Sequence, residues 1–377
     1  MSIQSTRRPA PPASSARAPL PDRRSPALSR RALLAGTAAG AVGLSLAACG
    51  KGKKAGSQAD SKTVTVVTHD SFHVSEDLQK AFTSETGYTL KIATSGDAGA
   101  LVNKLVLTKD APLGDAVFGI DNTYATRALD QGVIDTSATV SLPKGAESYV
   151  VADTPALAPI DVGDVCLNID TGYFTGKGLT PPATFEDLTK PEYKGLLVAI
   201  NPTNSSPGMA WLLATIGHFG AGSFGSYWKQ LMANGARIAE DWSAAYETDF
   251  SGGGKGTYPI VVSYASSPSF TVSKDKSSSS TSALLDTAFR QVEYAGVLKG
   301  AANPEGGKAF VEWMLSKAVQ EDIPGQMYMY PVLPDAALPE ALTKFGPLSK
   351  SPVKVEPKEI TTHREEWLNT WTEAVGK

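Results

Sequence analysis

The stretch AEDWSAAYETDF, at residues 239–250, places two aromatic side chains among carboxylates. Trp242 and Tyr246 are four positions apart, and Glu240 and Asp241 directly precede the tryptophan. In a helix this spacing puts both rings on one face, which is usually the face that packs into the core. Rings with polar neighbours can instead stack on a flat ligand. The spacing alone leaves both interpretations open.

Polar turns also follow the strands that the sequence predicts in its first third. They are His69, Asp70 and Ser71, then Ser95, Gly96 and Asp97, and then Asp121 and Asn122. In a parallel sheet flanked by helices, ligands bind beyond the carboxyl ends of the strands. We therefore expect these three turns to share one edge of a sheet and to contribute to a binding site.

The histidines do not form a recognisable metal motif. HDSFH, at residues 69–73, resembles the zinc-binding pattern H-E-x-x-H. Its first histidine closes a predicted strand, so the two imidazoles should not share a helix face as that site requires. The chain also lacks a phosphate-binding loop and the G-x-S-x-G turn of hydrolases. We therefore expect no catalytic residue, no metal site and no cofactor.

Cys166 lies within DVCLNID, residues 164–170, a run that predicts a strand. We interpret it as a small buried hydrophobic side chain, which is the usual state of a free cysteine. A nucleophilic cysteine would need a neighbouring base. Asp161 and Asp164 are the nearest candidates in the sequence.

The order of the predicted elements indicates an α/β fold. Residues 63–122 alternate as β-α-β-α-β, which favours a parallel sheet covered by helices. A second α/β set follows, with strands within 164–170, 195–200, 258–268 and 289–300 and helices within 207–220, 224–235, 303–316 and 362–377. Residues 274–282, KDKSSSSTS, are too polar to pack and predict a loop. Two such sets suggest two lobes with a ligand site between them.

Residues 1–48 have the features of an export signal. Arg30 and Arg31 form a twin-arginine pair before a short run of small apolar residues, and the following LAAC resembles a lipobox ending at Cys49. We expect Cys49 to carry lipid and residues 49–62 to form a flexible tether to the membrane. With Cys49 lipidated, no disulfide can form within the chain, since it has only two cysteines.

Cleavage before the lipobox cysteine would leave an acidic protein. It lowers Lys plus Arg from 35 to 28 and Asp plus Glu from 38 to 37, so the formal net charge changes from −3 to −9. An acidic surface disfavours nucleic acid and tolerates cationic ligands. We therefore expect no nucleic-acid partner.

Six short motifs resemble, in order, those of the thiamine-binding substrate-binding proteins of bacterial ABC transporters. They are THDSF at 68–72, GIDN at 119–122, NPTNSSPG at 201–208, DWSAAYE at 241–247, SYASSPSF at 263–270 and MYMYPV at 327–332. One such motif alone is not decisive, whereas six in the same order over residues 63–375 point to one family.

The resemblance implies a two-lobed α/β periplasmic-binding fold of type II topology, with the ligand cleft between lobes that a crossover hinge joins. We expect lobe 1 at residues 63–160 and 268–323, and lobe 2 at residues 161–267 and 324–377. The ligand contacts that the resemblance implies are His69, Asp97, Ser205, Trp242, Tyr264, Phe270 and Tyr328.

Three of these positions depart from the enteric members of the family. His69 and Phe270 stand where those members have Tyr, and Tyr328 stands where they have Trp. All three keep a flat ring, so stacking on a ligand survives. Phe270 lacks the hydroxyl group, which leaves one polar contact of the family unmatched.

The implied ligand is thiamine, with its phosphates as further candidates. Its thiazolium is a permanent flat cation that aromatic faces stabilise, and Asp97 could supply a countercharge. Ser205, Ser206 and the amides that open the following helix could hold a hydroxyethyl or phosphate group. Tyr246 either contacts the ligand or supports Trp242 from behind.

The implied partners are an ABC permease with its ATPase, and we expect a monomer on the outer face of the cell membrane. One alternative is a protein of the same fold that binds another small cation or ion. Ferric-binding relatives use two adjacent tyrosines, whereas Tyr264 is followed by Ala265. A second alternative is a thiaminase-like enzyme that uses Cys166.

Overall fold

The computed structural model describes residues 62–376. The predicted export signal and the lipidation site Cys49 lie outside the described residues, as does nearly all of the predicted tether. Within the described part, no helix is long and apolar enough to cross a membrane.

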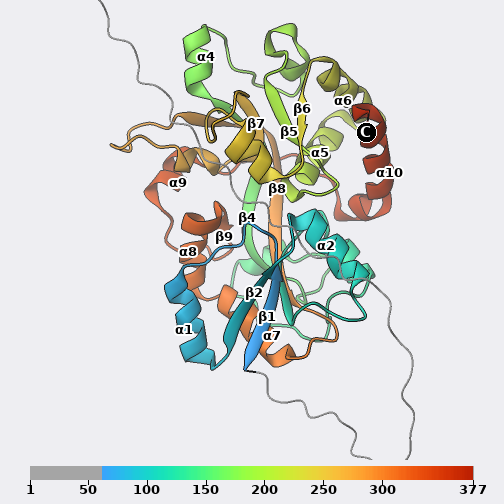
Figure 1. Cartoon of the computed structure of the whole chain (residues 1–377), viewed down its shortest axis with the longest axis vertical. Coiled ribbons are helices and arrows are strands. Elements are labelled where there is room, and N and C mark those ends of the chain that lie inside the picture. The colour runs from blue at the N-terminus through green and yellow to red at the C-terminus, as the bar shows by residue number, and fades with distance from the viewer. Residues whose placement is uncertain (1–61, 377) are drawn as a thin grey trace, which may run out of the picture. The chain divides into compact units, whose positions relative to one another are not determined.

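A single mixed sheet of nine strands organises residues 62–376 (Figure 1). The strands are β1 (Thr63–Thr68), β2 (Thr89–Thr94), β3 (Ala116–Asp121), β4 (Ala158–Asp170), β5 (Leu197–Ile200), β6 (Arg237–Ala239), β7 (Ile260–Tyr264), β8 (Thr281–Val297) and β9 (Tyr330–Pro331). Their order is β2-β1-β3-β8-β4-β7-β5-β6, and β9 pairs with β4. The two ends of this order form the two halves of the fold.

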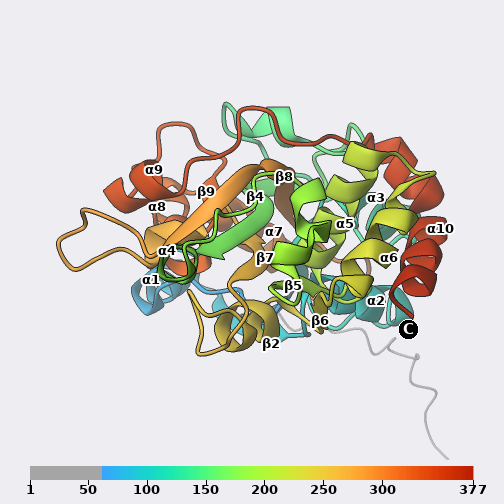
Figure 2. The same cartoon turned by 90° about the horizontal axis from the view of Figure 1, so that it is seen from above.

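Helices cover the sheet on both sides, as the view from above shows (Figure 2). The α-helices are α1 (Glu76–Thr86), α2 (Ala98–Leu107), α3 (Ala125–Asp130), α4 (Thr171–Lys177), α5 (Ser206–Phe219), α6 (Phe224–Ala233), α7 (Pro304–Met314), α8 (Lys317–Met327), α9 (Glu340–Phe345) and α10 (Pro357–Val375). A short π-helix spans Ala244–Asp249. The helices that the sequence predicts are therefore present, whereas α3, α4, α8 and α9 are not among them.

The first half confirms the predicted β-α-β-α-β unit. β1 pairs in parallel with both β2 and β3. Its alternating valines, Val64 and Val66, are fully buried. Helix α1 packs Phe82 into the core and ends at Gly87, whose φ of 74° suits a left-handed C-cap. Local patterning therefore determines this unit.

Strands β4 and β8 connect the two halves. They pair antiparallel along their length, from Ala158 opposite Ala295 to Asp170 opposite Thr281. The far ends of the pair join different neighbours, because β3 pairs with β8 and β7 pairs with β4.

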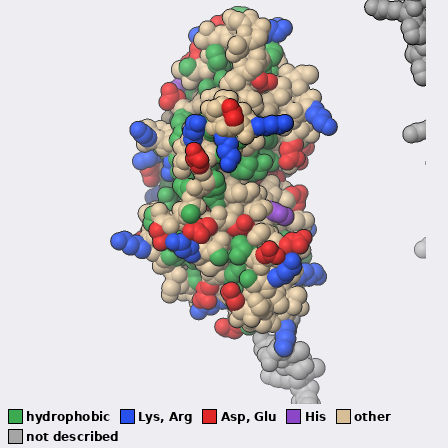
Figure 3. Space-filling model, turned by 90° about the vertical axis from the view of Figure 1, so that its left-hand side faces the viewer, with side chains coloured by type: hydrophobic (Ala, Val, Ile, Leu, Met, Phe, Trp, Pro, Cys, Tyr) green, Lys and Arg blue, Asp and Glu red, His purple; other side chains and the backbone are tan. Residues whose placement is uncertain are grey.

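Hydrophobic side chains reach the surface at the level where the halves meet (Figure 3). The residue boundaries predicted for the two lobes stay a prediction.

The sequence prediction for β8 was wrong about its start. The sequence predicts a loop at residues 274–282 and a strand at 289–300, yet β8 begins at Thr281. Apart from Thr281, its first six residues are half-buried or exposed, so the strand does not begin with a buried apolar run. Their backbone groups pair with β4 instead, and this distant partner is invisible in local sequence.

Helix α5 forms the core of the second half. Every residue from Ser206 to Ile216 is buried. Trp211 packs edge-on against Trp228 of α6, which in turn packs edge-on against Trp371 of α10. The C-terminal helix α10 is thus fixed to this half through its apolar face, as its amphipathic pattern predicts.

Candidate ligand cleft

The three polar turns lie at one edge of the sheet, as predicted, because β1 pairs in parallel with both β2 and β3. Asp121 and Asn122 do not line the cleft described below, and a contribution of the turns to ligand binding stays a prediction. The amide of Asp70 donates to the carbonyl of Gly96 at 3.0 Å. The amide of Gly96 donates back to Asp70 Oδ1, also at 3.0 Å. This edge faces the second half of the fold and forms one side of a cleft.

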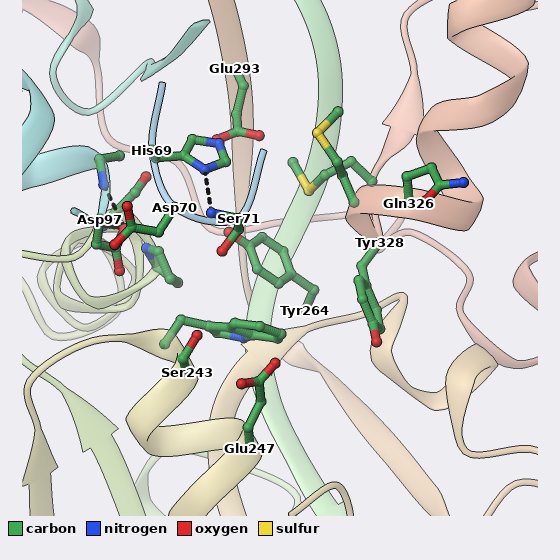
Figure 4. A pocket seen from close by; sticks show the side chains of 16 residues that line it. His69, Asp70, Ser71, Asp97, Ser243, Glu247, Tyr264, Glu293, Gln326 and Tyr328 are labelled. Atoms are coloured by element: carbon green, nitrogen blue, oxygen red, sulfur yellow. Dashed lines mark hydrogen bonds and ion pairs between the residues drawn. The ribbon is translucent and has the colours of Figure 1, made fainter. Parts of the chain in front are cut away.

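The cleft has a volume of about 360 Å³, within the range of small-molecule sites. Its lining residues are His69, Asp70, Ser71, Asp97, Ala98, Ser206, Pro207, Trp242, Ser243, Glu247, Tyr264, Glu293, Gln326, Met327, Tyr328 and Met329. Figure 4 shows His69 and Glu293 on one side, Ser243 and Glu247 on the opposite side, and Tyr264 between them. No Lys or Arg belongs to this lining set of described residues.

Trp242 forms an aromatic wall of the cleft and is held in place by two contacts. Its Nε1–H donates to Ser263 Oγ at 3.0 Å. The ring of Tyr246 stacks on it, with centroids 5.1 Å apart and planes 10° apart. Tyr246 does not line the cleft, so it lies behind Trp242. The indole is therefore presented to the cleft in one fixed orientation.

Tyr328 forms a second wall and adopts an unusual backbone conformation. It ends α8 with a φ of 66°, in the left-handed region that glycine favours. Such a conformation costs about 1 kcal/mol or more for a residue with a Cβ. Phe270 packs on its ring, with centroids 3.7 Å apart. Phe270 itself lies outside the lining and is 38% exposed.

His69 is buried beside Glu293 at the base of the cleft. Its Nε2 lies 3.2 Å from Glu293 Oε1, and its Nδ1 accepts a hydrogen bond from the Ser71 amide at 3.1 Å. Burial alone lowers the pKa of His69, but the neighbouring carboxylates, Glu293 first, raise it on balance. Gly119 makes room for the ring, since a Cβ there would lie 2.0 Å from His69 Cδ2.

Two further carboxylates lie where the halves meet. Asp97 caps α2 by accepting a hydrogen bond from the Ala98 amide at 2.6 Å. Burial raises the pKa of Asp97, and the hydrogen bond from Ser205 offsets only part of that rise. Asp121 is fully buried and accepts a hydrogen bond from Ser206 Oγ. Burial raises the pKa of Asp121 to about 6. The site is therefore rich in negative charge, which suits a cationic ligand.

Comparison with known proteins places the chain in a family. The model of the family described as bacterial extracellular solute-binding protein matches residues 115–346, which is more than half of the chain. The chain belongs to this family. Because proteins of this family bind solutes outside the cytoplasm, this solute-binding protein works in the extracytoplasmic space.

Individual relatives agree with the sequence resemblance. The thiamine-binding periplasmic protein of Salmonella typhimurium is 27% identical over 326 residues, which cover 83% of this chain and 94% of the relative. The corresponding protein of Haemophilus influenzae is 22% identical over 325 residues, 84% of this chain and 93% of the relative. The recognition of this family from six ordered motifs is thus confirmed.

Solved structures confirm the predicted fold class. A periplasmic thiamin binding protein matches with a TM-score of 0.72 and 25% identity, covering 84% of this chain and 96% of that one. Iron-bound HitA from Pseudomonas aeruginosa matches with a TM-score of 0.62 and 20% identity, covering 83% and 99%. The second likeness shows the fold alone. The solute-binding protein therefore has the two-lobed periplasmic-binding fold.

The structure separates the nine predicted contacts into two groups. The cleft lining includes His69, Asp97, Ser206, Trp242, Tyr264 and Tyr328. The other three are Ser205, Tyr246 and Phe270, which lie outside it. Ser205 is fully buried and caps α5, where its Oγ accepts the Gly208 amide at 3.5 Å. Direct contact between any of these residues and a ligand stays a prediction.

Sequence reasoning missed several lining residues, of which Glu293 and Glu247 carry charge. Glu293 stands in FRQVEYAGVL, between residues that predict a buried strand. A carboxylate at such a position is expensive to bury unless it has a partner or a function, and this signal was available. Glu247 belongs to the quoted motif DWSAAYE but was not assigned to the site.

Asp161 is a buried carboxyl that should make stability depend on pH. It is opposite Glu293 in the β4–β8 pair, and its side chain is fully buried. Burial first, and then Glu293, raise the pKa of Asp161 well above its usual range. The folded state therefore keeps a proton that the unfolded chain releases above about pH 3.9, so this contribution to stability falls as pH rises.

We therefore expect Asp161→Asn, which imitates the protonated carboxyl, to stabilise the protein at pH 8 by about 1–3 kcal/mol, with a much smaller effect at pH 4.5. Thermal unfolding at both pH values measures this difference. Asp110→Asn, at an exposed position, is the matched control and should leave the unfolding temperature unchanged at both pH values. A destabilised Asp161→Asn protein at pH 8 would contradict the assignment.

Proposed function

We propose that this solute-binding protein captures thiamine and delivers it to an ABC importer. The observation that carries the proposal is the composition of the cleft: aromatic walls at Trp242, Tyr264 and Tyr328, carboxylates around them, and no Lys or Arg among the described lining residues. A flat cation is the ligand that this combination favours. The relatives named as thiamine-binding proteins support the same ligand.

Thiamine fits the proposed site through its two rings. The thiazolium keeps its positive charge when water is removed, and each aromatic face stabilises it by about 0.5–2 kcal/mol. Glu293, which is 5% exposed, supplies a countercharge from a poorly solvated position. Asp97 can accept a hydrogen bond from the amino group of the aminopyrimidine. Binding of this kind needs no cofactor.

Delivery would take place at the outer face of the cell membrane. We propose that the chain is exported through its N-terminal signal, keeps a lipid on Cys49 and works as a monomer. Its partners would be a permease and the ATPase that drives it. The lipobox and the twin arginines at Arg30 and Arg31 support this proposal.

A thiaminase-like function of Cys166 is disfavoured by its surroundings. The thiol is fully buried and does not line the cleft. Burial raises the pKa of Cys166, and the nearby Asp164 carboxylate raises it further. Asp164 is itself paired with Arg290 and accepts the Ser349 amide at 2.6 Å, so it is not a free base. The proposed protein therefore binds thiamine without cleaving it.

The Cys166 thiol should accordingly resist alkylation in the native protein. We expect iodoacetamide at pH 8 to leave the peptide that contains Cys166 unmodified until denaturant is added. Peptide mass spectrometry distinguishes this thiol from Cys49. Rapid native modification, together with release of free thiazole from thiamine in the presence of a nucleophile, would contradict a pure binding function.

A thermal-shift panel tests the proposed function. The panel contains thiamine, ferric ion, spermidine and fructose 6-phosphate, each at the same concentration. Only thiamine should raise Tm by several degrees, because a ligand at 100 times its Kd stabilises the folded state by about 2.7 kcal/mol. Stabilisation by ferric ion or the sugar phosphate without any by thiamine would overturn the proposal.

A further inference from the structure

The two ring nitrogens of His69 have different partners, which select a neutral form of the imidazole (Figure 4). Its Nδ1 accepts a hydrogen bond from the Ser71 amide at 3.1 Å, so this nitrogen carries a lone pair and no proton. The proton of the neutral ring is then on Nε2, which lies 3.2 Å from Glu293 Oε1. The Ser71 amide thus fixes the tautomer that faces Glu293 with an N–H group.

The surroundings of His69 nevertheless favour a second proton on the ring. Burial by itself lowers the pKa of His69, but the carboxylates around the ring raise it on balance. These carboxylates are Glu293 of β8, Asp97 at the start of α2 and Asp70 in the same turn. The other titratable groups that act on Glu293, or on which it acts, are Asp161 of β4, Asp121 of β3 and Tyr264 of β7. The free cleft therefore holds a protonated His69 near neutral pH, and an Nδ1–H cannot accept the Ser71 amide.

A bound cation and a protonated His69 compete for the same carboxylate. Glu293 is 5% exposed, and both residues line the cleft. A ligand cation that uses Glu293 as its countercharge therefore lies close to the imidazole. Two like charges beside one poorly solvated carboxylate repel each other, and a group that can lose its charge does so. The thiazolium keeps its charge at every pH, whereas the imidazolium can release a proton.

We infer that His69 makes thiamine capture a proton exchange, in which the thiazolium displaces a proton from the imidazole and replaces it as the positive partner of Glu293. The Nδ1–H bond breaks, its electron pair stays on the nitrogen, and the proton passes to water. Nδ1 then accepts the Ser71 amide, as it does in the structure. The inference rests on the proposed function and gives His69 a part in specificity, because a neutral ligand would leave the proton in place.

The affinity for thiamine should consequently rise with pH. Binding has to remove the proton below the pKa of His69 in the free protein, and above that pKa the ring is already neutral. We expect Kd to fall about threefold or more between pH 6 and pH 8.5. Asp121, whose pKa burial raises to about 6, changes the affinity in the same direction. Identifying the group that releases the proton therefore needs a count of protons and variants of His69.

Calorimetric titration of the full chain at pH 7, in buffers of different ionisation enthalpy, counts the protons. We expect release of roughly half a proton or more per thiamine bound. A thiamine analogue with carbon in place of the thiazolium nitrogen should release less than about a fifth of a proton. Thiamine binding without proton release, or equal release for both ligands, would overturn the inference and leave the proposed function standing. Absence of thiamine binding would overturn both.

Two variants assign the proton to its group. His69→Gln keeps an N–H that can face Glu293 but has no titratable ring, so thiamine should bind to it with little proton release. Asp161→Asn removes another buried acid that adjoins Glu293 and lies outside the cleft lining, and it should release as many protons as the parent. Release that persists in His69→Gln and vanishes in Asp161→Asn would assign the proton to Asp161 and contradict the inference.

Nitrogen NMR of the imidazole rings in the parent chain gives a direct second readout. Thiamine at pH 7 should convert His69 from the doubly protonated form to the tautomer with its proton on Nε2, and the His69→Gln spectrum identifies the signals. This measurement decides the assignment even where His69→Gln binds thiamine too weakly to titrate. Signals of His69 that thiamine leaves unchanged would contradict the inference.

Discussion

Replacing Trp242 by Ala should weaken thiamine binding by tenfold or more. The indole forms a wall of the cleft, and Tyr246 behind it cannot move forward to replace it without losing its own packing against Phe250. The lost contact combines the cation–π term with the apolar area that the ring buries on a ligand, together about 1.5–3 kcal/mol. Calorimetric titration with thiamine measures the change in Kd.

Two variants separate loss of the ring from loss of the fold. Trp242→Phe keeps an aromatic face in the cleft and should therefore bind thiamine within a fewfold of the parent affinity. It loses only the Nε1–H that donates to Ser263. Tyr173→Ala removes an aromatic ring of α4 outside the cleft and should bind as the parent does. Unchanged affinity in Trp242→Ala would count against the whole assignment of the site.

Replacing Glu293 by Gln should weaken thiamine binding by roughly ten- to a hundredfold. The carboxylate is 5% exposed and faces the cleft, so water screens it poorly. Opposite unit charges about 5 Å apart attract by about 3 kcal/mol at an effective dielectric constant of 20. The amide oxygen of Gln can still accept a hydrogen bond from His69, and the fold should therefore survive.

A neutral ligand distinguishes a charge effect from a change of shape. Deazathiamine, in which carbon replaces the thiazolium nitrogen, has nearly the same shape as thiamine and no permanent charge. Glu293→Gln should alter its affinity by less than threefold. Equal losses for thiamine and its neutral analogue would show that Glu293 shapes the cleft and does not act as a countercharge.

The parts of the fold that the sequence predicted are those with local causes. β1 and α1 follow directly from a β-branched run, an apolar face of helical period and the C-cap glycine Gly87. The sharing of an edge by the turns around Asp70 and Gly96 followed from the parallel order of their strands. In the first case the deciding residues are neighbours in the sequence, and in the second they belong to consecutive strands of one β-α-β unit.

The parts that it missed depend on residues far apart in the chain. The first residues of β8 look like a loop until β4 supplies their backbone partners. Ser205 and Ser206 looked available for a ligand, because nothing near them in the sequence shows that Asp97 and Asp121 lie close enough to accept their protons. Glu293 could have been recognised as a charged residue in an apolar strand, but its pairing with His69 could not.

Direct titration of the full chain with thiamine at pH 7.5, monitored by calorimetry, tests the central claim most directly. We predict one site with a Kd below about 1 μM, which corresponds to a binding free energy of about −8 kcal/mol or stronger. The affinity should be abolished or greatly reduced in the double variant Trp242→Ala, Glu293→Gln. Absence of measurable heat with thiamine at millimolar concentration, from protein that unfolds cooperatively, would contradict the claim.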